Sequence, residues 1–190
     1  DIKRNLERKI NELLNIFPAV IIIGTRQCGK TSLAKHLRPT WEYFDLEAAN
    51  TFDKISRDLT FFFKEHPTNL IIDEAQIYPD IFKELRGVID SDRKKNNRFI
   101  ITGSSSLELL QSSSESLAGR VGIVELASFK LNEILNKPLS GFYKLFEKEF
   151  SNKTINEIKS LPIIGNHNEF KSHFLRGGYP DAALAKNDLA

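Results

Sequence analysis

The sequence contains a single cysteine, no methionine and no long apolar run. One cysteine excludes an intramolecular disulfide and suits a reducing compartment, so we expect a cytoplasmic protein. The apolar runs are far shorter than the ~20 residues that cross a bilayer, which argues against a membrane partner. Because position 1 is Asp and methionine is absent, the sequence also predicts a chain trimmed at its beginning.

The chain also lacks a large net charge of either sign. Lys and Arg number 27 and Asp and Glu 25, which gives a formal net charge of +2. This excess is too small to argue for nucleic acid as a partner. The basic cluster Arg93-Lys94-Lys95 leaves contact with nucleic acid open, although a solvated loop explains it as well. With 41% apolar and 27% charged residues, the 190-residue chain suits one α/β core and a small accessory subdomain.

The most informative stretch, Gly24-Thr-Arg-Gln-Cys-Gly-Lys-Thr31, matches the phosphate-binding pattern G-x-x-x-x-G-K-[ST] at every position. The β-branched run before it predicts a buried strand, and the residues after it predict a helix, which together form a P-loop. A chance match in an ordinary strand–turn–helix is the competing interpretation. The residues predicted to bind the nucleotide here are Gly24, Thr25, Arg26, Gln27, Cys28, Gly29, Lys30, Thr31 and Ser32.

Each part of the P-loop has a chemical role. Gly24 and Gly29 are expected to adopt backbone angles that a side chain blocks, so that successive N–H groups turn toward an anion. The helix N-terminus adds partial positive charge. Lys30 is predicted to neutralise the phosphate oxygens of a nucleotide, and the Thr31 hydroxyl to ligate Mg²⁺.

A second apolar run ends in two acids, Leu70-Ile-Ile-Asp73-Glu74. Asp73 is predicted to hold Mg²⁺ directly or through water. Glu74 is predicted to orient and polarise the attacking water. Two adjacent acids at the end of an apolar strand are costly unless a metal or a reaction uses them, although an exposed strand end is the alternative.

The remaining patterns predict an α/β fold of the P-loop NTPase type, with a parallel five-stranded sheet of order 5-1-4-3-2 and a helical lid. The strands are expected at residues 19–23, 41–46, 69–73, 98–102 and 122–126. The helices of this part are expected at residues 2–16, 31–37, 51–65, 80–92 and 105–110. We assign residues 1–130 to a P-loop core with an N-terminal helix and residues 131–190 to a lid of small helices.

The polar residues that close the fourth strand are candidates for sensing the γ-phosphate. Carboxyl ends of parallel strands line the ligand crevice, so Thr102 and Ser104 are expected there. AAA-type ATPases carry a γ-phosphate sensor at this place, and we favour Ser104 for it. Capping of the next helix by a serine explains the pattern equally well.

Two further candidates rest on resemblance to AAA-type ATPases. Arg120 stands just before the fifth strand, where these proteins often place an arginine finger that acts in cis or on a neighbouring subunit. A surface ion pair with Glu125 or another acid is the alternative. Gly178 and Pro180 fit the Gly-x-Pro turn that approaches adenine in related lids, although a purely structural turn fits as well.

Five motifs in this order and spacing resemble one family, the AAA-like ATPase of archaea and bacteria that usually precedes a C-terminal domain of unassigned function. The motifs are Gly24–Thr31, Leu70–Gln76, Phe99–Ser106, Leu117–Arg120 and Gly177–Pro180. The resemblance places the chain in the catalytic-glutamate branch. It implies Mg²⁺-dependent ATP hydrolysis that drives a conformational change in a C-terminal domain or protein partner, the chain being the ATPase module of a longer protein. GTP is disfavoured because Asn136-Lys and Asn152-Lys lack the aspartate of the guanine-reading motif.

Three other functions stay open. The nearest is a regulatory switch that binds ATP with negligible turnover. A small-molecule kinase also needs a P-loop, but its lid normally carries several arginines. A nucleic-acid-stimulated ATPase is suggested by Asp73-Glu-Ala-Gln76, yet a helicase needs a second motor domain that 190 residues do not supply.

Overall fold

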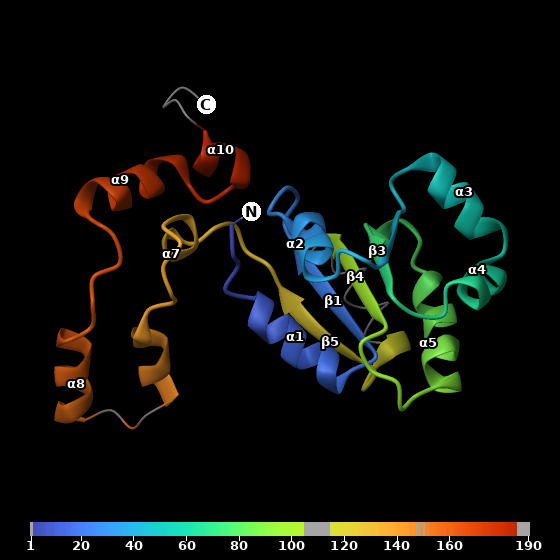
Figure 1. The fold of residues 1–190 in the computed structure, drawn as a ribbon, viewed down its shortest axis with the longest axis horizontal. Coiled ribbons are helices and arrows are strands. Elements are labelled where there is room, and N and C mark those ends of the chain that lie inside the picture. The colour runs from blue at the N-terminus through green and yellow to red at the C-terminus, as the bar shows by residue number, and fades with distance from the viewer. Residues whose placement is uncertain (1, 105–114, 148, 150, 186–190) are drawn as a thin grey trace. The chain divides into compact units, whose positions relative to one another are not determined.

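The computed structural model describes residues 2–104, 115–147, 149 and 151–185 (Figure 1). Two compact units make up the chain, one formed by Leu6–Ala127 and the other by Asp1–Asn5 together with Ser128–Ala190. In the described residues, no helix has the length and apolar character needed to cross a bilayer. The expected helix at residues 105–110 lies outside the described residues.

The first unit is built on a parallel sheet of five strands. They are β1 (Ala19–Gly24), β2 (Glu42–Asp45), β3 (Leu70–Asp73), β4 (Phe99–Ser104) and β5 (Val121–Glu125). Their order is β2-β3-β4-β1-β5, which confirms the predicted fold class and strand order. Since all neighbours are parallel, the carboxyl ends of the strands share one edge, and both β1 and β3 deliver their motifs there.

Helices connect these strands and cover the sheet. Their bounds are α1 (Glu7–Ile16), α2 (Lys30–Leu37), α3 (Ala49–Arg57), α4 (Leu59–Glu65), η1 (Ala75–Ile77) and α5 (Ile81–Ser91). The central strands are buried on both faces, and their residues alternate between two cores. Ile21 and Ile23 of β1 pack in one core with α3, α4 and α5, whereas Val20 and Ile22 pack in the other with α1 and α2 (Figure 1).

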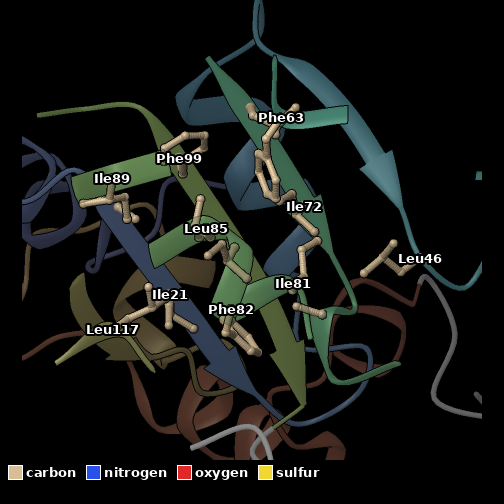
Figure 2. Close-up of a cluster of buried hydrophobic side chains, with 14 of the residues drawn as sticks. Ile21, Leu46, Phe63, Ile72, Ile81, Phe82, Leu85, Ile89, Phe99 and Leu117 are labelled. Carbon is tan, nitrogen blue, oxygen red and sulfur yellow. The ribbon is translucent and has the colours of Figure 1, made fainter. Parts of the chain in front are cut away.

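Aromatic and aliphatic side chains interlock in the first core. Figure 2 shows Phe63 of α4 and Phe82 and Leu85 of α5 gathered over Ile21 and Phe99 of the sheet. The rings of Phe63 and Phe99 meet edge to face, with centroids 6.2 Å apart. This packing fixes β1, β3 and β4 and therefore the loops at their carboxyl ends.

Two of the predicted helices were wrong in their bounds. The predicted helix 51–65 is two helices, because Asp58 is extended (φ −153°, ψ 90°) and its carboxylate accepts a hydrogen bond from the Phe61 N–H, which caps α4. The predicted helix 2–16 begins only at Glu7. Asn5 instead donates its N–H to Glu133 Oε1 at 2.7 Å, and Arg4 pairs with the same carboxylate, so both residues belong to the second unit.

The second unit consists of short helices in its described part. They are α7 (Leu131–Ile134), η2 (Gly141–Glu147), α8 (Asn152–Lys159), α9 (His167–Arg176) and α10 (Pro180–Leu184). Ser151 and Asn166 cap α8 and α9 with their side chains. Pro180 occupies the first position of α10, where proline is favoured.

Candidate functional site

The P-loop motif lies between the end of β1 and the start of α2, as its pattern predicts. Gly24 is the last residue of β1, and Lys30 is the first residue of α2. Gly29 forms the helix N-cap in the left-handed conformation (φ 96°), which favours glycine. The other left-handed residue of the loop is Gln27 (φ 62°), and these two positions turn the loop into the helix.

Gly24 is needed for a reason other than the predicted one. Its φ lies outside the left-handed region, so the backbone angle does not require glycine here. A Cβ at this position would instead lie 2.4 Å from the Leu126 carbonyl oxygen and 2.9 Å from Cys28 Sγ. Cys28, itself a residue of the loop, is fully buried. Glycine at position 24 therefore allows the loop to pack directly on the residue that follows β5.

Replacing Gly24 with alanine is expected to destabilise the folded unit by about 2–3 kcal/mol, because the new methyl group meets backbone that has no room to move. Gly87→Ala is the matched control, since Gly87 lies in α5 with nothing within 4 Å of the added Cβ. This control is expected to stabilise the protein by about 0.5–1 kcal/mol through helix propensity. Urea unfolding followed by circular dichroism measures both, and equal stability of the two variants would contradict the packing argument.

Lys30 is buried, with 4% of its surface exposed. Its Nζ donates to the carbonyl oxygens of Gly24, at 3.3 Å, and Thr25, at 3.1 Å. Among the described residues, no carboxylate lies within ion-pair distance of this ammonium group. A buried cation whose partners are neutral carbonyls keeps its positive charge available for an anion in the loop.

Asp73 and Thr31, the two predicted Mg²⁺ ligands, lie in contact. Thr31 Oγ1 donates to Asp73 Oδ2 at 2.7 Å, and the Thr102 hydroxyl donates to Asp73 Oδ1. Asp73 is the last residue of β3 and is 3% exposed. The two sensor candidates of β4 thus have different described partners, Asp73 for the Thr102 hydroxyl and Gln76 for the Ser104 N–H.

Tyr43 is a site residue that the sequence analysis missed. Its hydroxyl donates to Asp73 Oδ2 at 2.8 Å, and Lys35 Nζ lies 3.4 Å from the centre of its ring. Burial raises the pKa of the Tyr43 phenol, and the hydrogen bond to Asp73 and its charge raise it further, so the phenol remains a donor. The predicted order of the strands places the second beside the third, which brings Tyr43 near Asp73 but does not give the direction of its side chain.

Glu74 follows Asp73 in the left-handed conformation (φ 55°, ψ 45°), which is uncommon for a residue with a side chain and is often found at functional sites. Its N–H donates to Thr102 Oγ1 at 3.4 Å. Its carboxylate accepts a hydrogen bond from the Gln76 side-chain amide at 2.5 Å. The two adjacent carboxylates have different partners among the described residues, the Gln76 amide for Glu74 and hydroxyl groups for Asp73, so they are free to take different roles.

The exposed part of the P-loop carries few contacts. Arg26 Nη2 pairs with Glu47 Oε1 at 2.5 Å, and both side chains are more than half exposed. An ion pair of this kind contributes little to stability. Thr25, Gln27 and Ser32 are also exposed, so their predicted nucleotide contacts remain predictions.

Arg120 forms a two-point ion pair with Asp90 of α5. Its Nε and Nη2 donate to Asp90 Oδ1 and Oδ2, each at 2.8 Å, and its Nη1 donates to the Ala118 carbonyl. The guanidinium group holds the pKa of the Asp90 carboxyl below its ordinary value. None of the contacts described for Arg120 joins it to the P-loop or the acidic pair, so the structure does not gather it with them. Its arginine-finger role remains a prediction.

Gly178 lies in the turn between α9 and α10 of the second unit, and Pro180 is the first residue of α10. The Gly178 carbonyl accepts a hydrogen bond from the Phe129 N–H at 2.7 Å. A Cβ at position 178 would lie 2.2 Å from the Phe129 carbonyl oxygen, which explains the glycine by packing alone. The predicted approach of this turn to adenine remains a prediction.

A family model described as an AAA domain matches residues 17–135, well over half of the chain. The chain belongs to this family. The matched part of the AAA domain contains the P-loop, the acidic pair, Ser104 and Arg120, whereas Gly178 and Pro180 lie beyond it.

Two curated relatives are similar to this AAA domain, the uncharacterised proteins Rv2008c of Mycobacterium tuberculosis and Mb2031c of Mycobacterium bovis. Each is 34% identical over 133 residues, which cover 70% of this chain and 30% of the relative. Among solved structures, the Walker-type ATPase PABY2304 of Pyrococcus abyssi matches with a TM-score of 0.59 and 19% identity, over 95% of this chain and 65% of that one. This likeness shows the P-loop NTPase fold. The AAA domain therefore spans less than a third of its curated relatives' length and about two thirds of the solved neighbour.

The residues present fit a nucleotide and Mg²⁺. Gly29 turns the loop at the N-terminus of α2, and Lys30 has neutral partners that an anion can supplement. The Thr31 hydroxyl and the Asp73 carboxylate lie in contact, so both oxygens can bind one metal ion. Among the described side chains, no group of three or more His, Cys, Asp and Glu forms a metal cluster. A single carboxylate with a hydroxyl suits Mg²⁺ bound together with phosphates and water.

Proposed function

We propose that this AAA domain binds ATP with Mg²⁺ and hydrolyses the bond to its γ-phosphate. The observation that carries the proposal is the meeting of the P-loop and the acidic strand end, where the Thr31 hydroxyl and the Asp73 carboxylate lie 2.7 Å apart. Membership of the AAA family and the Walker-type ATPase among its structural neighbours support the same activity.

The roles of the protein groups follow from their chemistry. Lys30 and the N–H groups of the loop bind the phosphates, and Thr31 and Asp73 hold the metal. When bound, Mg²⁺ neutralises charge on the phosphate oxygens. Tyr43 and Thr102 keep Asp73 oriented through the hydrogen bonds they donate to it.

Glu74 is proposed to accept a proton from water and to aim that water at the γ-phosphate. Its carboxylate is proposed to stay outside the group that holds the metal, since its described hydrogen bond goes to Gln76 and not to Thr31 or Asp73. Ser104, at the end of β4, is proposed to sense the γ-phosphate. Arg120 is proposed to join the site only after leaving Asp90, in cis or on a neighbouring copy.

Hydrolysis is further proposed to drive a conformational change that acts on a C-terminal domain or a protein partner. The curated relatives, of which this chain covers 30%, support a partner region within the same polypeptide. ATP is preferred to GTP because the chain lacks the guanine-reading motif.

Titration calorimetry and a phosphate-release assay with the 190-residue protein test the proposal. We expect saturable heat with ATP and Mg²⁺, much weaker binding of GTP, and slow release of inorganic phosphate. Binding without phosphate release would assign the protein to regulatory switches instead. Absence of heat at millimolar nucleotide and Mg²⁺, with the protein folded, would refute nucleotide binding altogether.

A further inference from the structure

The side chain of Gln76 connects the acidic pair to the end of β4. Gln76 lies in the short helix η1, and its amide makes two hydrogen bonds in opposite directions. Its Nε2 donates to Glu74 Oε2 at 2.5 Å, and its Oε1 accepts from the Ser104 N–H at 3.1 Å. One side chain therefore joins the predicted water-orienting residue to the predicted γ-phosphate sensor.

The partners of Gln76 determine which way its amide points. The Ser104 backbone N–H can only donate, and an ionised carboxylate can only accept. The amide oxygen must then face Ser104 and the amide nitrogen must face Glu74, because the reverse orientation loses both hydrogen bonds. The bridge is specific to an amide of this length, since an acid lacks the donor and an apolar side chain lacks both groups.

A second pair of hydrogen bonds also links the acidic pair to β4. Thr102, also in β4, accepts the Glu74 N–H and donates to Asp73. Both the backbone and the side chain of Glu74 are thus tied to β4, the backbone through Thr102 and the carboxylate through Gln76. Because Glu74 holds an uncommon left-handed conformation, its position depends on such contacts from its surroundings.

Gln76 restrains the Glu74 carboxylate but leaves it able to accept further hydrogen bonds. A carboxylate has two oxygens with about four lone pairs, and Gln76 occupies a lone pair of Oε2 alone. No hydrogen bond from the described residues engages Oε1, which leaves this oxygen for water. A restraint on one oxygen narrows the orientations of the other, which is the property that a water-orienting group requires.

We propose that Gln76 is a positioning residue, which fixes the Glu74 carboxylate relative to β4 and transmits displacements of Ser104 to it. The inference rests on the proposed ATP hydrolysis and deepens it. When Ser104 moves on contact with the γ-phosphate, its N–H shifts Gln76 through the hydrogen bond between them. Gln76 in turn shifts Glu74. Water activation is thereby linked to the presence of the γ-phosphate.

Gln76→Met tests this role, because methionine has a similar length and makes neither hydrogen bond. We expect kcat for ATP hydrolysis to fall about 10- to 100-fold, as for loss of orientation of one catalytic group. The KM and the Kd for ATP are expected to stay within about twofold, since the described hydrogen bonds of Gln76 go to Glu74 and Ser104 and not to the P-loop or Asp73. The control is Ile77→Ala, which perturbs the same short helix at a side chain that is 40% exposed and is expected to leave kcat unchanged.

A double-mutant cycle with Glu74→Gln separates positioning from a merely structural role. If Gln76 acts through Glu74, adding Gln76→Met to Glu74→Gln is expected to change residual turnover less than about twofold. Equal losses in the two backgrounds, or wild-type kcat in Gln76→Met, would overturn the inference while the hydrolase proposal stands. A wild-type protein that binds ATP and releases no phosphate would overturn the hydrolase proposal first, and the inference with it.

Discussion

Lys30→Ala is expected to lose most of the affinity for ATP. The ammonium group is buried against two loop carbonyls, so it is already desolvated and oriented before any anion arrives. Removing such a charged partner costs about 2–4 kcal/mol of binding free energy, or roughly a 30- to 1000-fold rise in Kd. Calorimetry with ATP and Mg²⁺ measures the change.

Lys64→Ala is the matched control for this experiment. Lys64 is exposed in the last turn of α4, and its loss removes the same charge from the surface without touching the P-loop. We expect its Kd for ATP to equal that of the wild type. If Lys30→Ala is folded by circular dichroism and still binds ATP normally, the phosphate-binding role of the loop is refuted.

Glu74→Gln is expected to keep ATP binding and lose hydrolysis. General-base catalysis contributes about 10²- to 10⁴-fold, so kcat is expected to fall at least about 100-fold while the Kd for ATP changes less than about threefold. The substitution keeps the shape of the side chain, and its amide oxygen can still accept the hydrogen bond from Gln76. A single-turnover phosphate-release assay separates the chemical step from binding.

The control for Glu74→Gln is Glu65→Gln. Glu65 is exposed at the end of α4 and is expected to show wild-type kcat. Unchanged turnover in Glu74→Gln would remove the water-orienting role from this residue. Loss of ATP binding in the same variant would instead assign the carboxylate to the metal group with Asp73.

The sheet was predictable from the sequence because each buried parallel strand appears as a short, continuous apolar run. β1 and β3 are short runs of β-branched residues that end in a motif, and residues buried on both faces carry no polar alternation to confuse the pattern. Thr31 and Asp73 were predictable as neighbours for the same reason, since Asp73 ends β3 and Thr31 follows the P-loop that begins at the end of β1.

The features that escaped the sequence analysis depend on contacts between distant segments. Asp58 separates α3 from α4 because its side chain caps α4. The spacing of the apolar residues does not reveal such a cap. Asn5 leaves the expected first helix to meet Glu133, 128 residues away. The space beside Gly24 is filled by Leu126, so the reason for that glycine appears only once β5 is placed. Tyr43 and Gln76 join the site through side-chain directions that no spacing rule supplies.

The hydrogen bond from Tyr43 to Asp73 has a consequence for the border of the sheet. β2 is only four residues long and forms one rim of the five-stranded array, with a single neighbour, β3. Fraying is easiest at such a rim, because half of its backbone groups lack a strand to pair with. The carboxylate that is proposed to hold the metal is thereby tethered to an edge strand. We therefore expect any change that steadies or loosens β2 to alter the affinity of the site for Mg²⁺ as well.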